Sequence, residues 1–380
     1  MSESDSQPST PQAPEMPEAP VPDPVAGPVS EPVPEPIPEP IPDYVARVLA
    51  EADRMDFPVH LPPLRRPSRF DPVLITVVRD ELAQLPDFLD HHRARGVRAF
   101  LVLDNGSTDG SVAWLETQPD VRVTVIDRPF GWEAKHGWIT HVLRSLGTAY
   151  WYLLLDADER LCFPGEERHG LADLTAQMEL LDTWRVRGML VDLYPPGPVL
   201  APDGPAHTLF DGTGYRRETT GHLQSVRGGP RARALASESF PLEPELTKYP
   251  LFRLAHGEVP ANPHHYWPYG ENFKSPCFLG ILHYKFRGAL LDKVQRAVRE
   301  GNYWQGSFEY RAYQAAFAAN PELSLVYEGS RPYRSPQDLV DCGLLQPVDW
   351  RFARHHRVLR RLRDRWLPTP LWPWRRRTRS

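Results

Sequence analysis

Short apolar runs separated by amphipathic segments limit most strongly how this chain folds. The first run, residues 73–78, is continuous and largely β-branched, which is typical of a strand buried on both faces of a parallel sheet. Shorter runs of the same kind occupy residues 99–103, 121–125 and 150–155, and helical spacing of apolar residues occupies 82–95 and 133–146. Strands alternating with helices about every 25 residues predict an α/β fold with a mostly parallel sheet flanked by helices.

The two ends of the chain differ in composition from this middle part. Residues 1–43 hold 14 prolines and nine acidic residues, with no lysine or arginine, so they predict an extended or disordered tail. The pattern allows one helix at 44–55, followed by a proline-rich linker. We therefore divide the chain into an acidic tail and linker at 1–66, a main α/β domain at 67–290 and a helical extension with a basic tail at 291–380.

The last 30 residues carry 11 arginines against a single acid, Asp364, among tryptophans and leucines. This mixture is typical of a segment that lies on an anionic membrane surface. A solvated basic helix and a contact with the acidic residues 1–43 are the alternatives. Further helices are expected at 290–299 and 308–319, whereas 160–290 reads as irregular.

Several classes of protein are not expected from the sequence. No apolar run reaches the roughly 18 residues of a membrane span, and no signal peptide opens the chain. Cys162, Cys277 and Cys342 are too scattered for a disulfide framework, which predicts a reducing, cytoplasmic location. The middle of the chain is not basic, so we expect no nucleic-acid partner.

Polar segments follow three of the predicted strands. They are residues 79–81 (Arg-Asp-Glu), 104–110 (Asp-Asn-Gly-Ser-Thr-Asp-Gly) and 156–159 (Asp-Ala-Asp-Glu). Ligands of open α/β sheets bind beyond the carboxyl ends of the strands. Asp156 and Asp158, directly after an apolar strand, suit one divalent cation such as Mg²⁺ or Mn²⁺, which stabilises charge on a diphosphate leaving group. A capped strand end followed by a turn is the alternative.

Together, the order and spacing of these three segments resemble the family 2 glycosyltransferases, firmly over residues 71–163 and weakly to about 290. The branch with the most similar first motif has Arg-Asn-Glu there, where this chain has Asp80 in place of Asn. The resemblance implies a GT-A (Rossmann-like) fold, a nucleotide-diphosphate-sugar donor and a divalent metal at the Asp-x-Asp motif. It also implies inversion of configuration at the transferred sugar.

The resemblance assigns roles to individual residues. Arg79 and Glu81 line the nucleoside pocket, Asp104 accepts a hydrogen bond from the base, and Lys135 lies near the base or phosphate. Asp156 lies near the ribose and the metal, which Asp158 binds directly. Late histidines often complete such a metal shell, which makes His283 the third candidate ligand.

The residue that deprotonates the acceptor hydroxyl comes from the second half of the chain. The candidates are His264, His265 and Glu271, of which His265 is favoured. Residues 228–231 and Lys248 are candidates for anion contacts. Tyr266, Trp267 and Tyr269 are candidates for stacking on sugars, although core packing explains the same aromatics.

Three other functions stay open at this level. A phosphohydrolase normally carries Asp-x-Asp on its first strand, whereas this chain carries it on the fourth. A nucleotidyltransferase normally has a glycine-rich basic loop after the first strand. A binding protein without catalysis is the third alternative, and the intact Asp156 and Asp158 disfavour it. The acceptor, whether glycan, lipid-linked or envelope, is not indicated.

Overall fold

The computed structural model describes residues 40–63, 67–201, 206–220, 223–254, 257–260, 262, 264–269, 272, 277–287 and 290–350. From Ile41 onward these residues belong to one compact unit. Three predicted features lie outside the described residues: the proline-rich segment up to residue 39, the candidate base Glu271, and the arginine-rich tail at 351–380.

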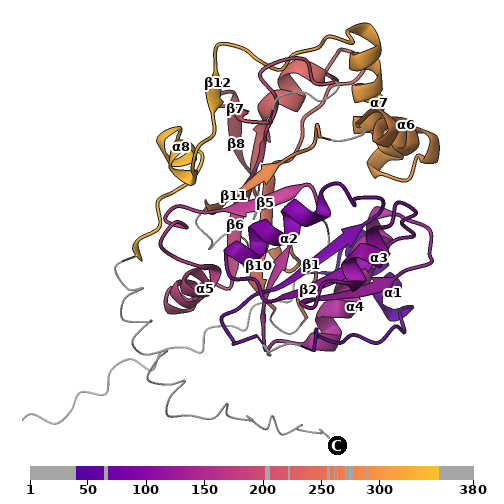
Figure 1. Cartoon of the computed structure of the whole chain (residues 1–380), viewed down its shortest axis with the longest axis vertical. Coiled ribbons are helices and arrows are strands. Elements are labelled where there is room, and N and C mark those ends of the chain that lie inside the picture. The colour runs from indigo at the N-terminus through magenta and orange to yellow at the C-terminus, as the bar shows by residue number, and fades with distance from the viewer. Residues whose placement is uncertain are drawn as a thin grey trace, which may run out of the picture. The chain divides into compact units, whose positions relative to one another are not determined.

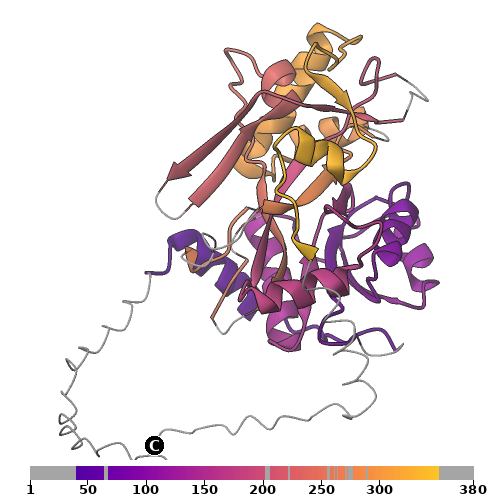
Figure 2. The ribbon, with the colours of Figure 1, turned by 90° about the vertical axis from the view of Figure 1, so that its left-hand side faces the viewer.

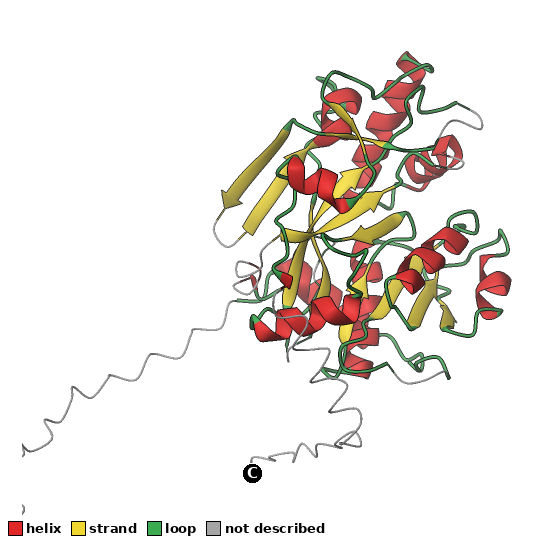
Figure 3. Ribbon diagram, turned by 60° about the vertical axis from the view of Figure 1, so that its left-hand side comes forward, coloured by secondary structure: helices red, strands yellow, loops and turns green. Residues whose placement is uncertain are grey.

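The main element is an eight-stranded sheet in the order β3-β2-β1-β4-β10-β6-β11-β5 (Figures 1 and 3). Its strands are β1 Val73–Val78, β2 Ala99–Asp104, β3 Val121–Val125, β4 Trp151–Leu154, β5 Glu159–Cys162, β6 Arg185–Asp192, β10 Thr247–Arg253 and β11 Cys277–His283. β1 to β4 run parallel, and so do β6 and β11. β10 runs antiparallel between β4 and β6, and β5 runs antiparallel at the edge. The sheet is therefore mixed but mostly parallel, as predicted.

Helices cover both faces of this sheet. α2 (Leu85–Ala94), α3 (Ser111–Glu116) and α5 (Leu171–Leu180) contribute to the core on one face. α4 (Trp132–Leu146) contributes Trp138, Ile139, Val142 and Leu143 to the core on the other face. α1 (Asp43–Asp53), expected at 44–55, packs on α4 at Gly137, where an added Cβ would lie 2.4 Å from Cβ of Glu51.

A second group of elements has its own core. It includes β7 (Leu209–Asp211), paired with β12 (Ser330–Pro332), and the π-helix η1 (Arg231–Leu235). α6 (Leu290–Glu300) and α7 (Trp304–Ala319) pack against these through Tyr194, Leu235, Val294, Tyr313 and Phe317. β8 (Tyr215–Thr220) and β9 (Leu223–Gly228) form a separate two-stranded ribbon beside the large sheet (Figure 2). α8 (Pro336–Asp341) follows near the end of the described chain.

The expectation of irregular structure at 160–290 is wrong, because half of the large sheet comes from that segment. The sequence pattern does not predict β10 as a strand, because β10 contains Pro250, which lies at a register shift against β6. A proline is tolerated in a strand at such an irregularity because it has no N–H to donate to the ladder. β6 begins at Arg185, ends at Asp192 and is interrupted by Arg187, so its apolar run is short. Among the described residues, no helix is both long and apolar enough to cross a membrane.

Candidate active site

A cavity of about 330 Å³ opens at the carboxyl ends of β1 and β4. We call it the cleft. Its lining comes from the ends of β1 and β2, the start of α4, the β4–β5 turn, β10, β11, α6 and α7. Carboxylates and histidines alternate there with the basic side chains of Arg79, Lys135, Arg231, Lys248, Lys285, Lys293 and Arg296. Segments far apart in sequence therefore bring charged groups of both signs into one space.

The loops after β1 and β2 are tied to one another by side chains that bind backbone. Asp80 has a left-handed backbone, with φ of 55°, and its N–H donates to Oγ of Ser107 at 2.8 Å. In return, Oδ1 of Asp80 accepts from the N–H of Thr108 at 2.8 Å. Asp80 thus holds the two loops together.

Asp104 is fully buried at the end of β2. Its Oδ1 accepts hydrogen bonds from the backbone N–H groups of Gly106 and Ser107, at 3.0 and 2.9 Å. Its Oδ2 has no hydrogen-bond partner among the described residues. Asp104 is not part of the cleft lining, whereas the neighbouring Asn105 is.

α6 forms one wall of the cleft and pairs with the loop after β1. Lys293 lies 2.8 Å from Glu81, Arg296 lies 2.5 Å from Asp80, and Glu300 lies 3.3 Å from Arg79. These three positions recur every three or four residues, so they lie on one face of the helix. Arg79 and Glu81, predicted to line the nucleoside pocket, do line the cleft and are paired with α6.

Two lysines neutralise the first part of the Asp-x-Asp turn. Lys135 of α4 lies 2.5 Å from Oδ1 of Asp156, and Lys248 of β10 lies 3.2 Å from Oδ2. Lys248 also pairs with Oε1 of Glu159. Burial alone would raise the pKa of Asp156, but the two ammonium groups outweigh it and hold that pKa below its usual range. Asp156 is therefore ionised and already engaged.

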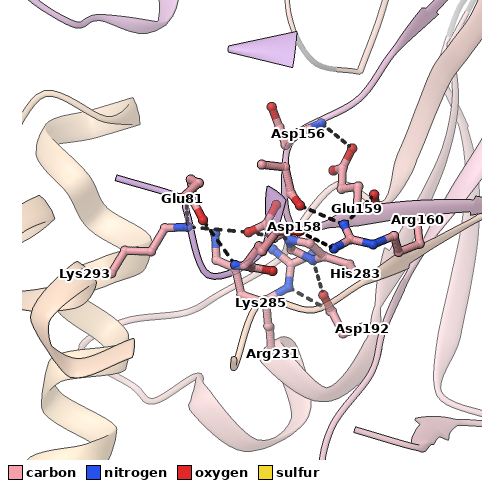
Figure 4. A network of polar contacts seen from close by, with 12 residues as sticks. Glu81, Asp156, Asp158, Glu159, Arg160, Asp192, Arg231, His283, Lys285 and Lys293 are labelled. Carbon is pink, nitrogen blue, oxygen red and sulfur yellow. Dashed lines mark hydrogen bonds and ion pairs between the residues drawn. The ribbon is translucent and has the colours of Figure 1, made fainter. Parts of the chain in front are cut away.

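The second part of the turn faces a histidine (Figure 4). Nε2 of His283 lies 3.7 Å from Oδ2 of Asp158, and its Nδ1 lies 2.6 Å from Oδ1 of Asp192. Burial lowers the pKa of His283, but the two carboxylates outweigh it and raise the pKa above its usual value. Lys293 reaches to 3.6 Å from Asp158. His283 is thus held between two buried carboxylates.

Asp158, Glu159 and His283 fit a divalent cation. Each offers one ligand atom, all three atoms lie within 4.8 Å of one another, and all three residues are buried. Two carboxylates and an imidazole are ordinary ligands of divalent metals. This group contains Asp158 and His283 from the predicted ligands, replaces Asp156 by Glu159, and leaves Asp156 with the lysines.

The predicted residues of the second half separate in the structure. His264 lines the cleft, with Nδ1 2.9 Å from the carbonyl oxygen of Thr247, and burial lowers its pKa to about 3. His265 is not among the lining residues. Neither are Tyr266, buried against Phe252, or Trp267 and Tyr269. The aromatic residues that do line the cleft are Phe130, Trp132, Tyr303, Trp304 and Tyr310.

Several residues in or next to the cleft are not predicted by the sequence analysis. Lys293, Arg296 and Glu300 form a charged stripe in a helix that was predicted, so their spacing was a usable signal. Asp192 does not itself line the cleft but contacts His283, and it ends β6 in a segment expected to be irregular, so no sequence pattern pointed to it. Lys248 and Arg231 were noted as anion contacts, yet both are paired with carboxylates in the structure.

Comparison with known proteins gives distant similarities to solved structures. No protein-family model matches the chain, and no curated protein matches it. One similar solved structure is the mannosyltransferase PcManGT from Pyrobaculum calidifontis in complex with GDP-Man and Mn²⁺, at 23% identity and a TM-score of 0.23. That match covers 39% of this chain and 42% of the mannosyltransferase, which is less than half of its length.

Two further solved structures have comparable similarity. A 4-diphosphocytidyl-2C-methyl-D-erythritol synthase matches at 16% identity and a TM-score of 0.25, over 48% of this chain and 73% of the synthase. The WbbM bifunctional glycosyltransferase matches at 15% identity and a TM-score of 0.22, over 34% of this chain and 24% of its own. Glycosyltransferases and a 4-diphosphocytidyl-2C-methyl-D-erythritol synthase are thus among the structures that this chain is similar to.

Proposed function

We propose that this protein is a glycosyltransferase that moves a sugar from a nucleotide-diphosphate sugar to an acceptor hydroxyl. The observation that carries the proposal is the buried group of Asp158, Glu159 and His283, set in a cleft lined by basic side chains. A dianionic diphosphate beside a divalent cation needs carboxylate ligands on one side and positive groups on the other. Family 2 membership, from the motifs at 79–81, 104–110 and 156–159, belongs to the same proposal.

In this proposal the two ends of the donor occupy different parts of the cleft. The nucleoside lies by the loops after β1 and β2, with Arg79, Glu81 and Asp104, and Lys135 and Asp156 lie near the ribose and phosphates. Asp158, Glu159 and His283 hold Mn²⁺ or Mg²⁺. When bound, that ion supplies charge stabilisation for the leaving diphosphate.

The proton acceptor also belongs to the proposal. His264, His265 and Glu271 are the candidates from the sequence, with His265 favoured. Glu245 joins them because, like His264, it lines the cleft. The acceptor molecule would then enter from the β10 side of the cleft, opposite α6. The product would have inverted configuration at the transferred sugar.

The test is incubation of the full chain with a panel of nucleotide sugars and Mn²⁺, followed by detection of released nucleoside diphosphate. Asp158→Asn should abolish release, whereas Asp211→Asn, a buried aspartate outside the cleft lining, should not. A second arm supplies nucleoside triphosphate with a sugar phosphate. Release of inorganic diphosphate in that arm alone would identify a nucleotidyltransferase and overturn the proposal.

A further inference from the structure

Strand register places three polar residues side by side at the edge of the sheet. His283 of β11 is the direct partner of Glu159 on β5 and of Asp192 on β6. Directly paired residues on neighbouring strands project their side chains to the same face of a sheet. The strand pairing itself therefore sets Glu159, His283 and Asp192 in a row.

Asp192 is fixed on both of its oxygens. It is 1% exposed, its Oδ1 lies 2.6 Å from Nδ1 of His283, and its Oδ2 accepts from Nε of Arg231 at 2.8 Å. Arg231 is itself held by Glu309, whose Oε1 lies 2.8 Å from Nη1. The result is a chain of contacts from Glu309 through Arg231 and Asp192 to one nitrogen of the imidazole. Figure 4 shows Arg231, Asp192 and His283 of this chain.

We propose that Asp192 is a positioning residue for the metal centre. By accepting the Nδ1–H of His283 it selects the tautomer whose Nε2 lone pair is free, and it turns that nitrogen toward Asp158. The inference rests on the proposed function, because it assigns how His283 is prepared to bind a divalent cation with Asp158 and Glu159. Carboxylates that accept from the far nitrogen of a ligating histidine fix its orientation and raise its basicity.

A matched pair elsewhere in the fold separates this role from that of a buried ion pair. Asp211 is also 1% exposed and is also paired with an arginine of η1, Arg233, at 2.9 Å. Its remaining contact is the hydroxyl of Tyr194 rather than an imidazole. Replacing Asp211 therefore removes a buried aspartate–arginine pair and leaves His283 untouched.

The test measures Mn²⁺ binding to the full chain by electron paramagnetic resonance, which detects the ion left free in solution. An asparagine at position 192 can turn either its oxygen or its amide nitrogen to Nδ1, so it no longer selects the tautomer. We expect Asp192→Asn to weaken Mn²⁺ binding by about 10- to 100-fold. Asp211→Asn should bind Mn²⁺ as the unmodified protein does.

A second measurement needs no variant at position 192. Nitrogen-15 NMR of the Cd²⁺-loaded protein, with the His283 signals assigned by His283→Gln, reports which ring nitrogen carries the proton. A proton on Nδ1 with Nε2 shifted by the metal supports the proposal, and a proton on Nε2 overturns it.

The outcomes distinguish this inference from the function on which it rests. If the unmodified protein binds Mn²⁺ and Asp192→Asn binds it equally well, the positioning role fails while the metal centre stands. If the unmodified protein binds no Mn²⁺, both fail. Equal weakening by Asp192→Asn and Asp211→Asn would also overturn the inference, since loss of any buried aspartate–arginine pair would then explain it.

Discussion

The two walls of the cleft satisfy their carboxylates in different ways. On the side of β1 and β2, Asp104 and one oxygen of Asp80, which do not themselves line the cleft, accept hydrogen bonds from backbone N–H groups of the loop after β2. The other oxygen of Asp80 pairs with Arg296 of α6. On the wall formed by β5, β11 and β6, the carboxylates of Asp158, Glu159 and Asp192 face side-chain cations or an imidazole. On the first side, carboxylates stabilise the backbone of a loop. On the second side, carboxylates pair with charged side chains.

This difference indicates which wall is prepared to exchange partners. A carboxylate that holds a backbone turn cannot leave it without disrupting the loop. A carboxylate paired with a lysine or a histidine can exchange that partner for a metal ion, and the released lysine can meet a phosphate. Buried ion pairs contribute little net stability because of their desolvation cost, so a cluster of them is a candidate for function.

Asp158→Asn should give the largest effect and tests the exchangeable wall directly. The side chain keeps its size but loses the charge that a divalent cation needs. We expect a loss of several kcal/mol in transition-state stabilisation, about 10³-fold or more in kcat, in a protein that still folds and melts cooperatively. Nucleoside diphosphate release and thermal melting are the measurements. Full turnover in this variant, or in the unmodified protein after EDTA treatment, would contradict the assignment.

Lys248→Met should lower the free energy of unfolding as well as affect turnover. The buried lysine lies between Asp156 and Glu159, so its removal leaves the buried carboxylate of Glu159 and the half-buried carboxylate of Asp156 with one cation fewer. Breaking such a pair costs about 3–5 kcal/mol, which urea unfolding would report. Arg47→Met is the control, since Arg47 pairs with Glu133 at the surface with 57% of its side chain exposed. The control should cost at most about 1 kcal/mol, and equal costs would remove the contrast between buried and surface pairs.

The two kinds of pairing also predict different behaviour in acid. His91 on α2 lies 2.7 Å from the carbonyl oxygen of Leu161, and burial, with Arg95 nearby, lowers its pKa to about 3. The unfolded chain binds a proton at this residue near pH 6.5, so stability falls as the pH drops from 6.5 toward 3. We expect His91 to account for a loss of about 2 kcal/mol at pH 5.

Urea unfolding at pH 7 and pH 5 checks this for the unmodified protein and for His91→Gln, which should lose less stability over that interval. The buried ion pairs of Glu309 lose their contribution to stability only at lower pH. Burial raises the pKa of Glu309, but Arg231 and Lys285 outweigh it and lower that pKa to about 2. The stability that Glu309 contributes is lost only below about pH 4.5. An equal loss between pH 7 and 5 in both proteins would contradict the role of His91.

The first half of the fold follows from local patterns, and the second half does not. β1 to β4 are apolar runs whose neighbours in sequence are also neighbours in the sheet, except for the step from β3 to β4. β5, β6, β10 and β11 pair in an order that departs from the chain order, and Pro250 and charged residues interrupt their patterns. Because of these interruptions, local sequence patterns predict neither these strands nor their pairing.

The same limit applies to the cleft. Asp156, Asp158 and Glu159 are adjacent in sequence, so a motif suffices to bring them together. Asp192 and His283 meet only through the pairing of β6 with β11, 91 residues apart. Their contact therefore could not be predicted from the sequence, although His283 itself is a candidate ligand in the sequence because it ends an apolar run. The ion pairs of α6 with residues 79–81 needed the packing of α6 for the same reason.

Asp104→Asn should give the smallest effect and tests whether the backbone-held wall also binds ligand. The asparagine oxygen keeps the two N–H bonds of the loop, while the unpartnered Oδ2 is replaced by an amide NH₂. If Oδ2 accepts from a base, nucleoside diphosphate affinity should fall by about 1–2 kcal/mol in calorimetry, since an acceptor becomes a donor. Asp109→Asn is the control, because Asp109 also holds this loop through Leu82 and Ser111 and does not line the cleft. Unchanged affinity in both variants would confine Asp104 to shaping the loop and sharpen the contrast between the walls, whereas equal losses would show that loop shape, and not a base contact, sets the affinity.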